Sequence, residues 1–432
     1  MDKQITSLSN LPPKGTSDWF GDEFLIRKYI FDTWREVCQN YGYEEYLTPL
    51  FEDARIYRAK SGEDVGDKEL TTFISKSGKE YAIRPEMTPS VTRLVSRIYE
   101  ARSKPIRLFS IANFVRNEKP QKGRNREFWQ LNYDIFGADG INADVETLMM
   151  AIDIMKKFDP PKDSFKIFLN HRKLIDFILD NVARIDKHKK VKIIRLMDKW
   201  KKLSLEEFKE KLNKINLAVE QIDVIINYII SDNRNDLLKK IPQVEENQGF
   251  KELNEILTKL EMLGYGEWIA YKSDIIRGFD YYDGMVFEVF DQNKNNPRSL
   301  FGGGRYNGLA QIFGGSSFPA VGCAPGDETT KIFLQNWNLV PRLLDKIKDQ
   351  VYYMPLITKE KEIEVMKLAQ KIRSNKINLI LGLELRNISK ALDYASKNRI
   401  DRVILYGDDE INQKKYIIKD LKTGKQEEFS IE

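Results

Sequence analysis

The sequence predicts an α+β core, an antiparallel sheet flanked by helices, that is interrupted by a helical insertion and followed by a small C-terminal α/β domain. Strand-like sequence with two-residue alternation occupies residues 105–136 and returns at residues 268–290. The Lys-rich stretch 172–265 between them has a helical period and almost no Gly. After residue 351, strand and helix patterns alternate, which is typical of a small parallel sheet.

The length of 432 residues corresponds to two or three domains. We expect the core to comprise residues 1–171 and 266–335, on either side of the insertion. A linker over residues 336–350 then leads to the α/β domain at 351–432. The formal charge of +5 permits a nucleic-acid partner without requiring one.

Scarce residues exclude several classes of protein. The chain has two His and two Cys and no CxxC or HxxxH spacing, so a zinc site is not expected. Two distant Cys build no disulfide framework, which favours the reducing cytoplasm. The N-terminal sequence has no apolar signal core, and no run approaches the ~18 apolar residues of a membrane span, so no membrane association is expected.

The core begins with an expected helix that ends at Gly42. Its helical pattern consists of the apolar residues Leu25, Ile26, Tyr29, Ile30, Trp34 and Val37. A short strand is expected within residues 42–49, GYEEYLTP. Inside the insertion, Ser204 and Glu207 form a capping-box pattern. In the second part of the core, Asp283-Gly284 predicts a hairpin turn between two strands.

The C-terminal domain is predicted from a strand–helix–strand–helix–strand order. The first helix carries apolar residues at i, i+3, i+4 and i+7, namely Val365, Leu368, Ala369 and Ile372. The second repeats this spacing at Ile388, Ala391, Leu392 and Ala395. Strand-like VYYMPL, INLIL and RVILYG precede, separate and follow the two helices.

The most informative segment is residues 106–137. In its second half, Trp129, Leu131, Tyr133 and Ile135 share one face of a strand, and Phe128, Gln130, Asn132, Asp134 and Phe136 share the other. The first face suits a core. The second shows polar groups bracketed by aromatic rings, which suits a half-enclosed site for a planar ligand.

The loop 116–126 holds five basic residues and one acidic residue, a net charge of +4. Guanidinium groups in such a loop suit phosphate oxygens, although a solvated basic hairpin loop explains the same charges equally well. The chain has no GxxxxGK[ST] and no GxGxxG, so neither a P-loop nor a dinucleotide fold is expected. The glycines of residues 301–308 either let backbone approach a ligand closely or form a tight turn.

Together these segments resemble class II histidyl-tRNA synthetases over nearly the whole chain. FVRNEKPQKGRNREFWQ resembles motif 2 of that family, and GYEEYLTP resembles motif 1. IIRGFDYY (275–282) and GGRYNGL (303–309) resemble two segments peculiar to the histidine enzymes, and the last 80 or so residues resemble their anticodon-binding domain. The resemblance implies a class II synthetase core that carries a helical insertion.

The resemblance also implies roles for individual residues. Histidine would be bound by Glu86, Met87, Thr88, Arg116, Gln130, Asp134, Arg277, Tyr281 and Tyr282. ATP would be bound by Arg116, Glu118, Arg124 and Phe128, and Glu118 would lie near its Mg²⁺. Arg116 and Arg277 would be catalytic, and Gln121 and Arg126 would lie near the acceptor end of the tRNA.

The implied reaction forms histidyl-adenylate from histidine and ATP and then transfers histidine to the 3′ end of tRNA(His). Neither step needs a protein nucleophile, so few His and Cys residues suffice. The resemblance of motif 1 further implies a homodimer, because that segment forms the subunit interface in class II enzymes.

Three positions depart from the family pattern. Asp134 replaces the usual Glu, Asn307 replaces the usual Asp, and Thr329 stands where motif 3 normally ends in an Arg that contacts the ATP γ-phosphate. Lys331 or another basic residue would have to compensate. The absent Arg favours an alternative, a histidine-binding regulatory paralogue of the type that controls ATP phosphoribosyltransferase. The intact RGFDYY and the C-terminal domain oppose it. A third alternative is a catalytically inactive RNA-binding protein.

Overall fold

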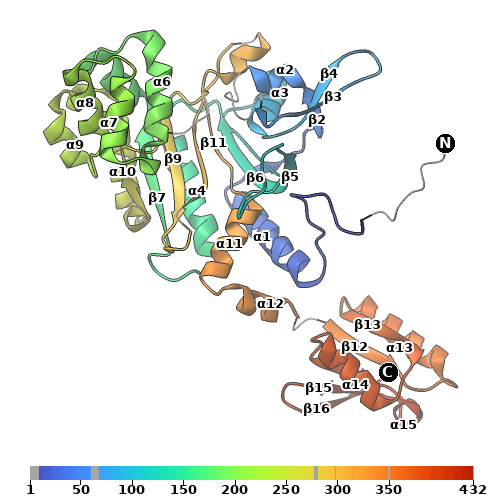
Figure 1. Ribbon diagram of the computed structural model, residues 1–432. Coiled ribbons are helices and arrows are strands. Elements are labelled where there is room, and N and C mark those ends of the chain that lie inside the picture. The colour runs from blue at the N-terminus through green and yellow to red at the C-terminus, as the bar shows by residue number, and fades with distance from the viewer. Residues whose placement is uncertain are drawn as a thin grey trace. The chain divides into compact units, whose positions relative to one another are not determined.

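The computed structural model describes residues 9–59, 68–276, 281–296, 298–314, 316–348 and 351–431. These residues form two units (Figure 1). The larger contains the residues up to 20 and residues 27–339, and the smaller contains residues 21–26 and those from 340 onward. None of the helices in the described ranges combines the length and apolar character that a membrane crossing requires.

The larger unit is built on an eight-stranded sheet. In spatial order its strands are β1 (Glu44–Glu45), β5 (Ile106–Val115), β6 (Glu127–Phe136), β11 (Ala320–Cys323), β10 (Ser299–Arg305), β9 (Met285–Asp291), β7 (Phe165–His171) and β8 (Ile269–Tyr271). The strand pairs are antiparallel except for β1 with β5 and β7 with β8 at the two edges. The predicted antiparallel core sheet is therefore confirmed, and segments on both sides of the insertion contribute to it.

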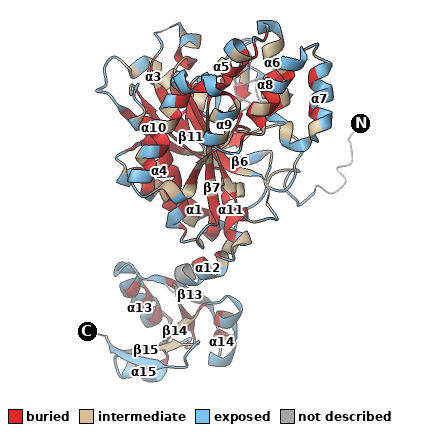
Figure 2. Ribbon diagram, turned by 90° about the vertical axis from the view of Figure 1, so that its left-hand side faces the viewer, coloured by how far each residue is buried: buried red, intermediate tan, exposed pale blue. Residues whose placement is uncertain are grey.

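Helices cover this sheet, and buried residues concentrate along its strands (Figure 2). The helices outside the insertion are α1 (Gly21–Asn40), α2 (Ala54–Arg58), α3 (Thr88–Ile98), α4 (Asn142–Lys157) and α11 (Asp327–Asn336). Helices α4 and α11 pack on β6. A separate three-stranded sheet has the order β2 (Phe51–Asp53), β4 (Glu80–Ile83) and β3 (Thr71–Ile74).

The strands β5 and β6 form the hairpin predicted from residues 106–137, paired from Ile106 with Phe136 to Val115 with Glu127. The predicted alternation is confirmed. On one face, Trp129 packs on Phe31 of α1, with ring centroids 5.4 Å apart, and the Tyr133 hydroxyl donates to the Thr147 carbonyl of α4. The opposite face of β6 is therefore left to line a site.

The predicted insertion is helical. It contains α5 (Arg172–Phe177), η2 (Ile178–Val182), α6 (Lys187–Asp198), η3 (Trp200–Lys202), α7 (Leu205–Asn213), α8 (Val219–Ile229), α9 (Arg234–Lys240), η4 (Pro242–Glu246) and α10 (Gln248–Met262). The capping box of Ser204 and Glu207 is present at the start of α7. The short turn η5 (Gly266–Trp268) leads back to the sheet.

A buried polar network joins the insertion to the sheet. Asn170 of β7 places its amide nitrogen 2.7 Å from the Tyr228 hydroxyl of α8 and 2.8 Å from the Ser273 carbonyl oxygen. The Ser273 hydroxyl in turn lies 2.9 Å from the Ile229 carbonyl oxygen and 3.0 Å from that of Ser231. The segment 273–276 is thus held from two sides.

The hairpin predicted at Asp283-Gly284 is wrong. Strand β9 pairs with β7 and β10, and residues 281–284 form no strand. The Asp283 carboxylate instead accepts hydrogen bonds from the backbone N–H groups of Asn307 and Gly308, at 3.2 and 3.1 Å, and so caps the turn after β10. The Asp283-Gly284 pair, which predicted a local turn, instead makes a contact with residues more than twenty positions away.

Close packing of neighbouring strands and side chains explains the glycines at positions 303 and 304. A Cβ on Gly303 would stand 2.1 Å from the Gly322 carbonyl oxygen, and one on Gly304 would stand 2.8 Å from the Tyr282 ring. Neighbouring backbone and an aromatic ring therefore occupy the space that side chains would need. The short turn η6 (Leu309–Phe313) follows this segment.

The smaller unit contains a five-stranded sheet with the order β13 (Asn378–Leu385), β12 (Val351–Leu356), β14 (Arg402–Leu405), β15 (Lys415–Asp420) and β16 (Gln426–Ser430). The three strands of the predicted parallel part pair in parallel, and β15 and β16 extend the sheet in antiparallel fashion. Its helices are α13 (Glu362–Ser374), α14 (Ile388–Lys397) and α15 (Asp408–Asn412). The stretch 336–350, expected to be a linker, contains the helix α12 (Val340–Lys348).

Candidate active site

A cavity of about 610 Å³ opens in the larger unit, beside the face of β6 that does not pack on α1 and α4. It brings together most of the residues singled out in the sequence. Those that line it are Glu86, Thr88, Arg116, Glu118, Arg124, Phe128, Gln130, Asp134, Tyr281 and Tyr282.

The floor of the cavity is the row of alternate residues along β6. Phe128, Gln130, Asn132 and Asp134 all border it. The Gln130 amide nitrogen donates to the Ala324 carbonyl at 3.2 Å. The Asn132 amide nitrogen is buried and has no hydrogen-bond partner among the described residues. Asn132 was placed on this face by its spacing, but no role was assigned to it.

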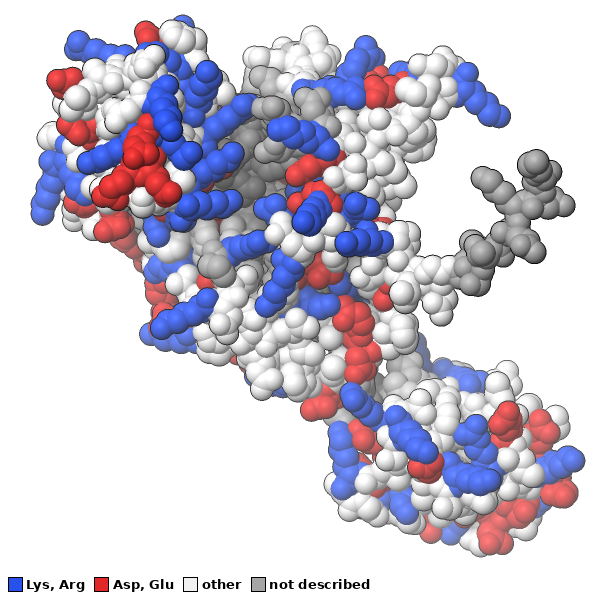
Figure 3. Space-filling model, in the orientation of Figure 1, with Lys and Arg blue, Asp and Glu red and all other residues white. Residues whose placement is uncertain are grey.

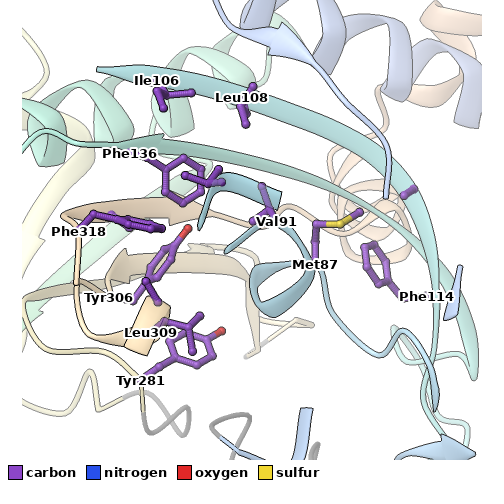
Figure 4. Packing of buried hydrophobic residues seen from close by; sticks show 14 residues of the cluster. Met87, Val91, Ile106, Leu108, Phe114, Phe136, Tyr281, Tyr306, Leu309 and Phe318 are labelled. Atoms are coloured by element: carbon purple, nitrogen blue, oxygen red, sulfur yellow. The ribbon is translucent and has the colours of Figure 1, made fainter. Parts of the chain in front are cut away.

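Asp134 is the acidic residue of this row, and it is 4% exposed. Its Oδ1 accepts a hydrogen bond of 2.5 Å from the Tyr306 hydroxyl, and its Oδ2 has no partner among the described residues. Burial raises the pKa of Asp134 to about 7, and the Tyr306 hydrogen bond opposes that rise. Tyr306 lies in an apolar cluster with Phe136, Phe318 and Tyr281, which fixes its ring (Figure 4).

Gly322 leaves the space that Asp134 occupies. A Cβ at position 322 would stand 1.9 Å from the Asp134 Oδ1. Because β6 and β11 pair Asp134 directly with Gly322, the carboxylate folds over the neighbouring strand. Neither Tyr306 nor Gly322 was identified from the sequence, although Tyr306 lies within the GGRYNGL segment.

The start of α3 supplies the second buried carboxylate. Glu86 accepts a hydrogen bond of 3.0 Å from the Tyr281 hydroxyl, and both residues are at least nine-tenths buried. Thr88 begins α3 and borders the cavity. The side chain of Met87 does not line the cavity. It is fully buried in the apolar cluster of Figure 4 and accepts from the Thr48 hydroxyl, so it supports the wall instead.

The opposite end of the cavity is charged. The Arg116 guanidinium carbon lies 5.0 Å from the centre of the Phe128 ring, and its Nε donates to the Pro85 carbonyl at 3.0 Å. Arg124 pairs with Glu118 at 3.3 Å. Among the described residues, no group of three or more His, Cys, Asp or Glu is arranged to hold a metal ion.

The two residues expected near the tRNA acceptor end, Gln121 and Arg126, are not among those that line the cavity. Gln121 accepts from Arg298 at 3.0 Å, and the Nε of Arg126 donates to the Glu118 carbonyl at 3.3 Å. Both residues belong to the loop between β5 and β6, of which Glu118 and Arg124 line the cavity. Arg277, the residue on which the catalytic expectation most depends, lies outside the described residues.

Thr329 borders the cavity in the first turn of α11, and its hydroxyl donates to the Gly326 carbonyl at 3.1 Å. Just before it, Asp327 and Glu328 both pair with the buried Arg27 of α1. Burial raises the pKa of Asp327 to about 6, and the Arg27 charge opposes that rise. Arg27 was not identified from the sequence, because its partners are some 300 residues away.

The insertion adds cations to the same cavity. Arg172, Arg195 and Lys199 border it, whereas Lys331 does not. In Figure 3, Lys and Arg side chains of the insertion gather beside the hollow that separates it from the rest of the unit. These residues carried no motif. Their signal in the sequence was the Lys-rich composition of the stretch.

Comparison with known proteins agrees with this fold and site. The family model for histidyl-tRNA synthetase matches residues 15–326, and the model for the anticodon-binding domain matches residues 350–432. The histidine–tRNA ligase of Leptospira biflexa is 35% identical over 422 residues, which cover 96% of this chain and 94% of that protein. The histidine–tRNA ligase of Pyrococcus horikoshii is 33% identical over 425 residues, with 97% and 96% covered.

The crystal structure of histidyl-tRNA synthetase from Nostoc sp. PCC 7120 has the same fold, with a TM-score of 0.81 over 98% of this chain and 97% of that one at 23% identity. The fold and the two matched models define an aminoacyl-tRNA ligase with an anticodon-binding domain. The chain belongs to the histidyl-tRNA synthetase family. The regulatory alternative is not favoured, because these relatives are ligases over nearly the full length.

Proposed function

We propose that this chain activates histidine with ATP to histidyl-adenylate and transfers histidine to the 3′ end of tRNA(His). One observation carries the proposal: a single cavity holds, at one end, a buried carboxylate whose Oδ2 lacks a partner in the described part of the chain, and at the other end Arg116 and Arg124. The first end suits a small polar ring, and the second suits phosphate.

Histidine would lie over β6 with its ring toward Asp134 and Tyr282. Glu86 and Thr88 would hold its α-ammonium group with help from Gln130, since a carboxylate, a hydroxyl and an amide oxygen are acceptors for N–H donors. Tyr281 would close the same pocket through its hydrogen bond to Glu86. Met87 would contribute only by supporting the first turn of α3.

In the activation step, an oxygen of the histidine carboxylate attacks the α-phosphorus of ATP. The bond from that phosphorus to the bridging oxygen breaks, and pyrophosphate leaves. Arg116 and Arg277 would neutralise charge on the α-phosphate, so both would be catalytic, and Arg124 would reach the departing pyrophosphate. Phe128 would stack the adenine beside Arg116. A ribose hydroxyl of the tRNA then attacks the acyl carbon, and AMP leaves.

Mg²⁺ would accompany ATP here, with Glu118 as its ligand. Glu118 is mostly buried, borders the cavity and lies 3.3 Å from a single Arg. One carboxylate together with phosphate oxygens is a usual environment for Mg²⁺ in nucleotide sites. The ion would neutralise phosphate charge when bound.

The missing motif 3 Arg would be replaced by cations of the insertion. Thr329 offers no charge to the γ-phosphate, and Asp327 and Glu328 beside it bring negative charge that Arg27 offsets. Arg195 and Lys199 at the end of α6 border the same cavity. We therefore expect them, rather than Lys331, to face the end of the triphosphate.

The tRNA would contact both units. Gln121 and Arg126 belong to the same loop as Glu118 and Arg124, which line the cavity, and the acceptor end would pass this loop. The segment 351–432 carries 16 basic and 13 acidic residues, a net charge of +3. Phosphate contacts by these residues would make tRNA affinity fall as salt rises.

A homodimer is proposed from an apolar surface next to motif 1. Leu47, Leu50, Phe51, Phe73 and Ile74 are exposed, and the rings of Phe51 and Phe73 are 5.5 Å apart. Exposed apolar side chains that lie together in this way support an interface. Phe51→Glu should convert a dimer to monomers in sedimentation equilibrium, and an unchanged mass would remove the support for this surface.

The cytoplasm is the proposed compartment. Cys38 and Cys323 are buried thiols, which suit a reducing environment.

The decisive experiment is ATP–pyrophosphate exchange with histidine compared with the other amino acids. We expect exchange that requires histidine and falls about 100-fold in Arg277→Ala, as when a pre-organised oxyanion donor is lost. Charging of tRNA(His) transcript then tests the second step. Histidine binding without pyrophosphate exchange would favour the regulatory paralogue. Binding of tRNA without binding of histidine would favour the catalytically inactive RNA-binding protein.

A further inference from the structure

Residues 13–16 form a tight turn, here called the Gly15 turn. The Pro13 carbonyl accepts from the backbone N–H of Thr16 at 3.0 Å and from the Thr16 hydroxyl at 2.8 Å. Gly15, the third residue of the turn, has a φ of +89°. A type II turn needs a positive φ at that position, which favours Gly. The turn is therefore closed by its own hydrogen bonds, with Gly where the backbone requires it.

The carbonyl of Gly15 joins this turn to the loop 116–126. It accepts from the backbone N–H groups of Arg126 and Glu127, at 2.8 and 3.2 Å, where the loop ends and β6 begins. At the other side of the same end, the backbone N–H of Arg116 donates to the Arg126 carbonyl at 2.8 Å. The base of the loop is thus held both by its own strand pair and by a distant segment of the chain.

The contact between the turn and the loop is closely packed. A Cβ on Gly15 would stand 2.7 Å from the Cγ of Pro120 and 2.9 Å from the Cγ of Arg126. Pro120 lies in the first half of the loop and Arg126 at its end, so the turn touches both parts. Any residue larger than Gly would have to move the Pro120 ring, the Arg126 side chain or the turn itself.

The segment that carries the turn is anchored to the core at Trp19. The Arg27 guanidinium carbon lies 4.0 Å from the centre of the Trp19 ring, and the rings of Trp19 and Trp129 have centroids 6.1 Å apart. Arg27 belongs to α1, and Trp129 lies on the face of β6 that packs on α1. Because Trp19 is fixed between helix and sheet, the Gly15 turn has a fixed position from which it can hold the loop.

The loop held in this way supplies charged groups to the phosphate end of the cavity. Arg116, Glu118 and Arg124 all border the cavity. Elsewhere the loop rests on α11, where the Asn125 amide donates to the Glu328 carboxylate at 2.9 Å. The cavity-lining groups of the loop therefore depend for their position on α11 and on the Gly15 turn.

We propose that Gly15 is a positioning residue, whose carbonyl fixes the loop 116–126 so that Glu118 and Arg124 meet the phosphates of ATP. Gly15 is not among the described residues that border the cavity, so it acts through the loop. This inference rests on the proposed function, since ATP is the ligand that the loop would meet. Groups that stabilise a transferring phosphoryl group must be in place beforehand, and a shift of about 1 Å can abolish much of their effect.

The test compares Gly15→Ala with Gly264→Ala in ATP–pyrophosphate exchange by the full-length chain. Gly264 also has a positive φ, of +83°, but among the described residues no atom lies within 4 Å of a Cβ at that position. Both variants therefore carry similar backbone strain, and only Gly15→Ala presses against the loop. Since one neutral hydrogen bond is worth up to about tenfold, we expect the KM for ATP to rise about tenfold in Gly15→Ala.

The KM for histidine should stay within about twofold of the wild-type value in Gly15→Ala, because one hydrogen bond at the base of the loop is lost and not the buried end of the cavity. Gly264→Ala should leave both KM values unchanged. A merely structural role of Gly15 would reduce the amount of active enzyme without changing either KM. An unchanged KM for ATP, or equal rises for ATP and histidine, would overturn the assignment.

If Gly15→Ala does not fold, Thr16→Val carries the comparison, because it removes one of the two hydrogen bonds to the Pro13 carbonyl. We expect the KM for ATP to rise about threefold in Thr16→Val, whereas Thr16→Ser, which keeps the hydroxyl, should behave like the wild type. Equal KM values for ATP in the two Thr16 variants would count against the proposal in the same way.

Hydrogen exchange of the backbone amides, read by mass spectrometry, tests the positioning role without catalysis. We expect residues 116–127 to exchange about tenfold faster in Gly15→Ala than in Gly264→Ala, whereas residues 128–136 keep their wild-type rates. If the wild-type chain shows no pyrophosphate exchange but the loop responds in this way, the proposed function fails and the positioning role stands. Equal hydrogen exchange of the loop in the two variants would reject the positioning role.

Discussion

At one end of the cavity, Asn132, Asp134 and Glu86 are at most 4% exposed, whereas at the other end the side chain of Arg124 is 57% exposed. The buried end fixes hydrogen-bonding groups by packing, as Tyr306 and Gly322 fix Asp134. The other end gathers charges, and water and salt screen the exposed ones, such as Arg124. The difference indicates that selection among amino acids occurs at the first end, and that the second holds a highly charged group common to all substrates.

The largest expected effect is a loss of stability at the buried ion pairs of Arg27, which lie next to the charged end of the cavity. Arg27 is 2% exposed and pairs with Asp327, which is fully buried, and with Glu328. Arg27→Ala would leave a buried carboxylate without its counter-charge, so we expect a loss of about 3–5 kcal/mol in the free energy of unfolding by urea.

The matched control is Lys28→Ala, one residue along α1. Lys28 pairs with Asp32 at the surface, where both side chains are more than half exposed. That change should cost at most about 0.5 kcal/mol. Similar losses of unfolding free energy in the two variants would mean that the buried ion pairs of Arg27 contribute no more to stability than the surface pair of Lys28.

The next largest effect is expected on the use of histidine, at the buried end of the cavity. Asp134→Asn removes the charge that would accept the ring N–H, and a hydrogen bond to a charged group is worth about 1.5–3 kcal/mol. We expect kcat/KM for histidine to fall on the order of 100-fold in pyrophosphate exchange, with the KM for ATP unchanged. A rise in the KM for ATP instead would show that Asp134 serves the phosphate end.

Stability should change in the opposite direction to activity at this residue. Burial raises the pKa of Asp134 to about 7 in the folded protein, against about 3.9 in an unfolded chain. Between these values the folded state binds the proton more tightly, so ionisation of Asp134 costs stability as pH rises through this window.

Without bound histidine, the Asp134→Asn variant should therefore be more stable than the wild type. The difference in stability between the two should increase from pH 5 to pH 8. Thermal unfolding at both pH values measures it. A gap that narrows toward pH 8 would mean that the carboxylate is stabilised, not strained, by its buried surroundings.

The smallest effect is expected at the exposed end itself. Replacing Arg195 and Lys199 together by Ala removes two cations from the cavity wall. Because exposed charges contribute at most about 1 kcal/mol each, we expect the KM for ATP to rise about fivefold and the effect to shrink at high salt.

Lys192→Ala is the control for that pair, since Lys192 is an exposed residue of α6 that does not border the cavity. Adding Thr329→Arg to the double variant should restore much of the lost affinity. No restoration would place the end of the triphosphate away from the first turn of α11.

Local patterns in the sequence predicted the parts of this site that depend on local structure. The two faces of β6 follow from its period of two, so Gln130 and Asp134 could be assigned to one wall before any fold was known. The basic loop followed from composition alone. The spacing did not show that the side chain of Met87 turns into the core, although its neighbours Glu86 and Thr88 border the cavity.

Contacts between distant segments were not predictable in this way. Tyr306 reaches Asp134 across 172 residues, and Arg27 reaches Asp327 across 300. No periodicity links such positions. The turn signal at Asp283-Gly284 misled for the same reason, because the Asp283 carboxylate accepts from Asn307 and Gly308 and not from its own turn.

The network around Asn170 bears on how the insertion could be lost or exchanged. The hydroxyl of Tyr228 and the carbonyl of Ile229, both from α8, meet Asn170 and Ser273 of the surrounding core. Deleting residues 172–265 in favour of a short loop would strip these partners from the strand ends that lead toward residue 277. The helical block is therefore not a detachable module, and a minimised enzyme or a chimera would have to replace its buried polar contacts before any catalytic residue is considered.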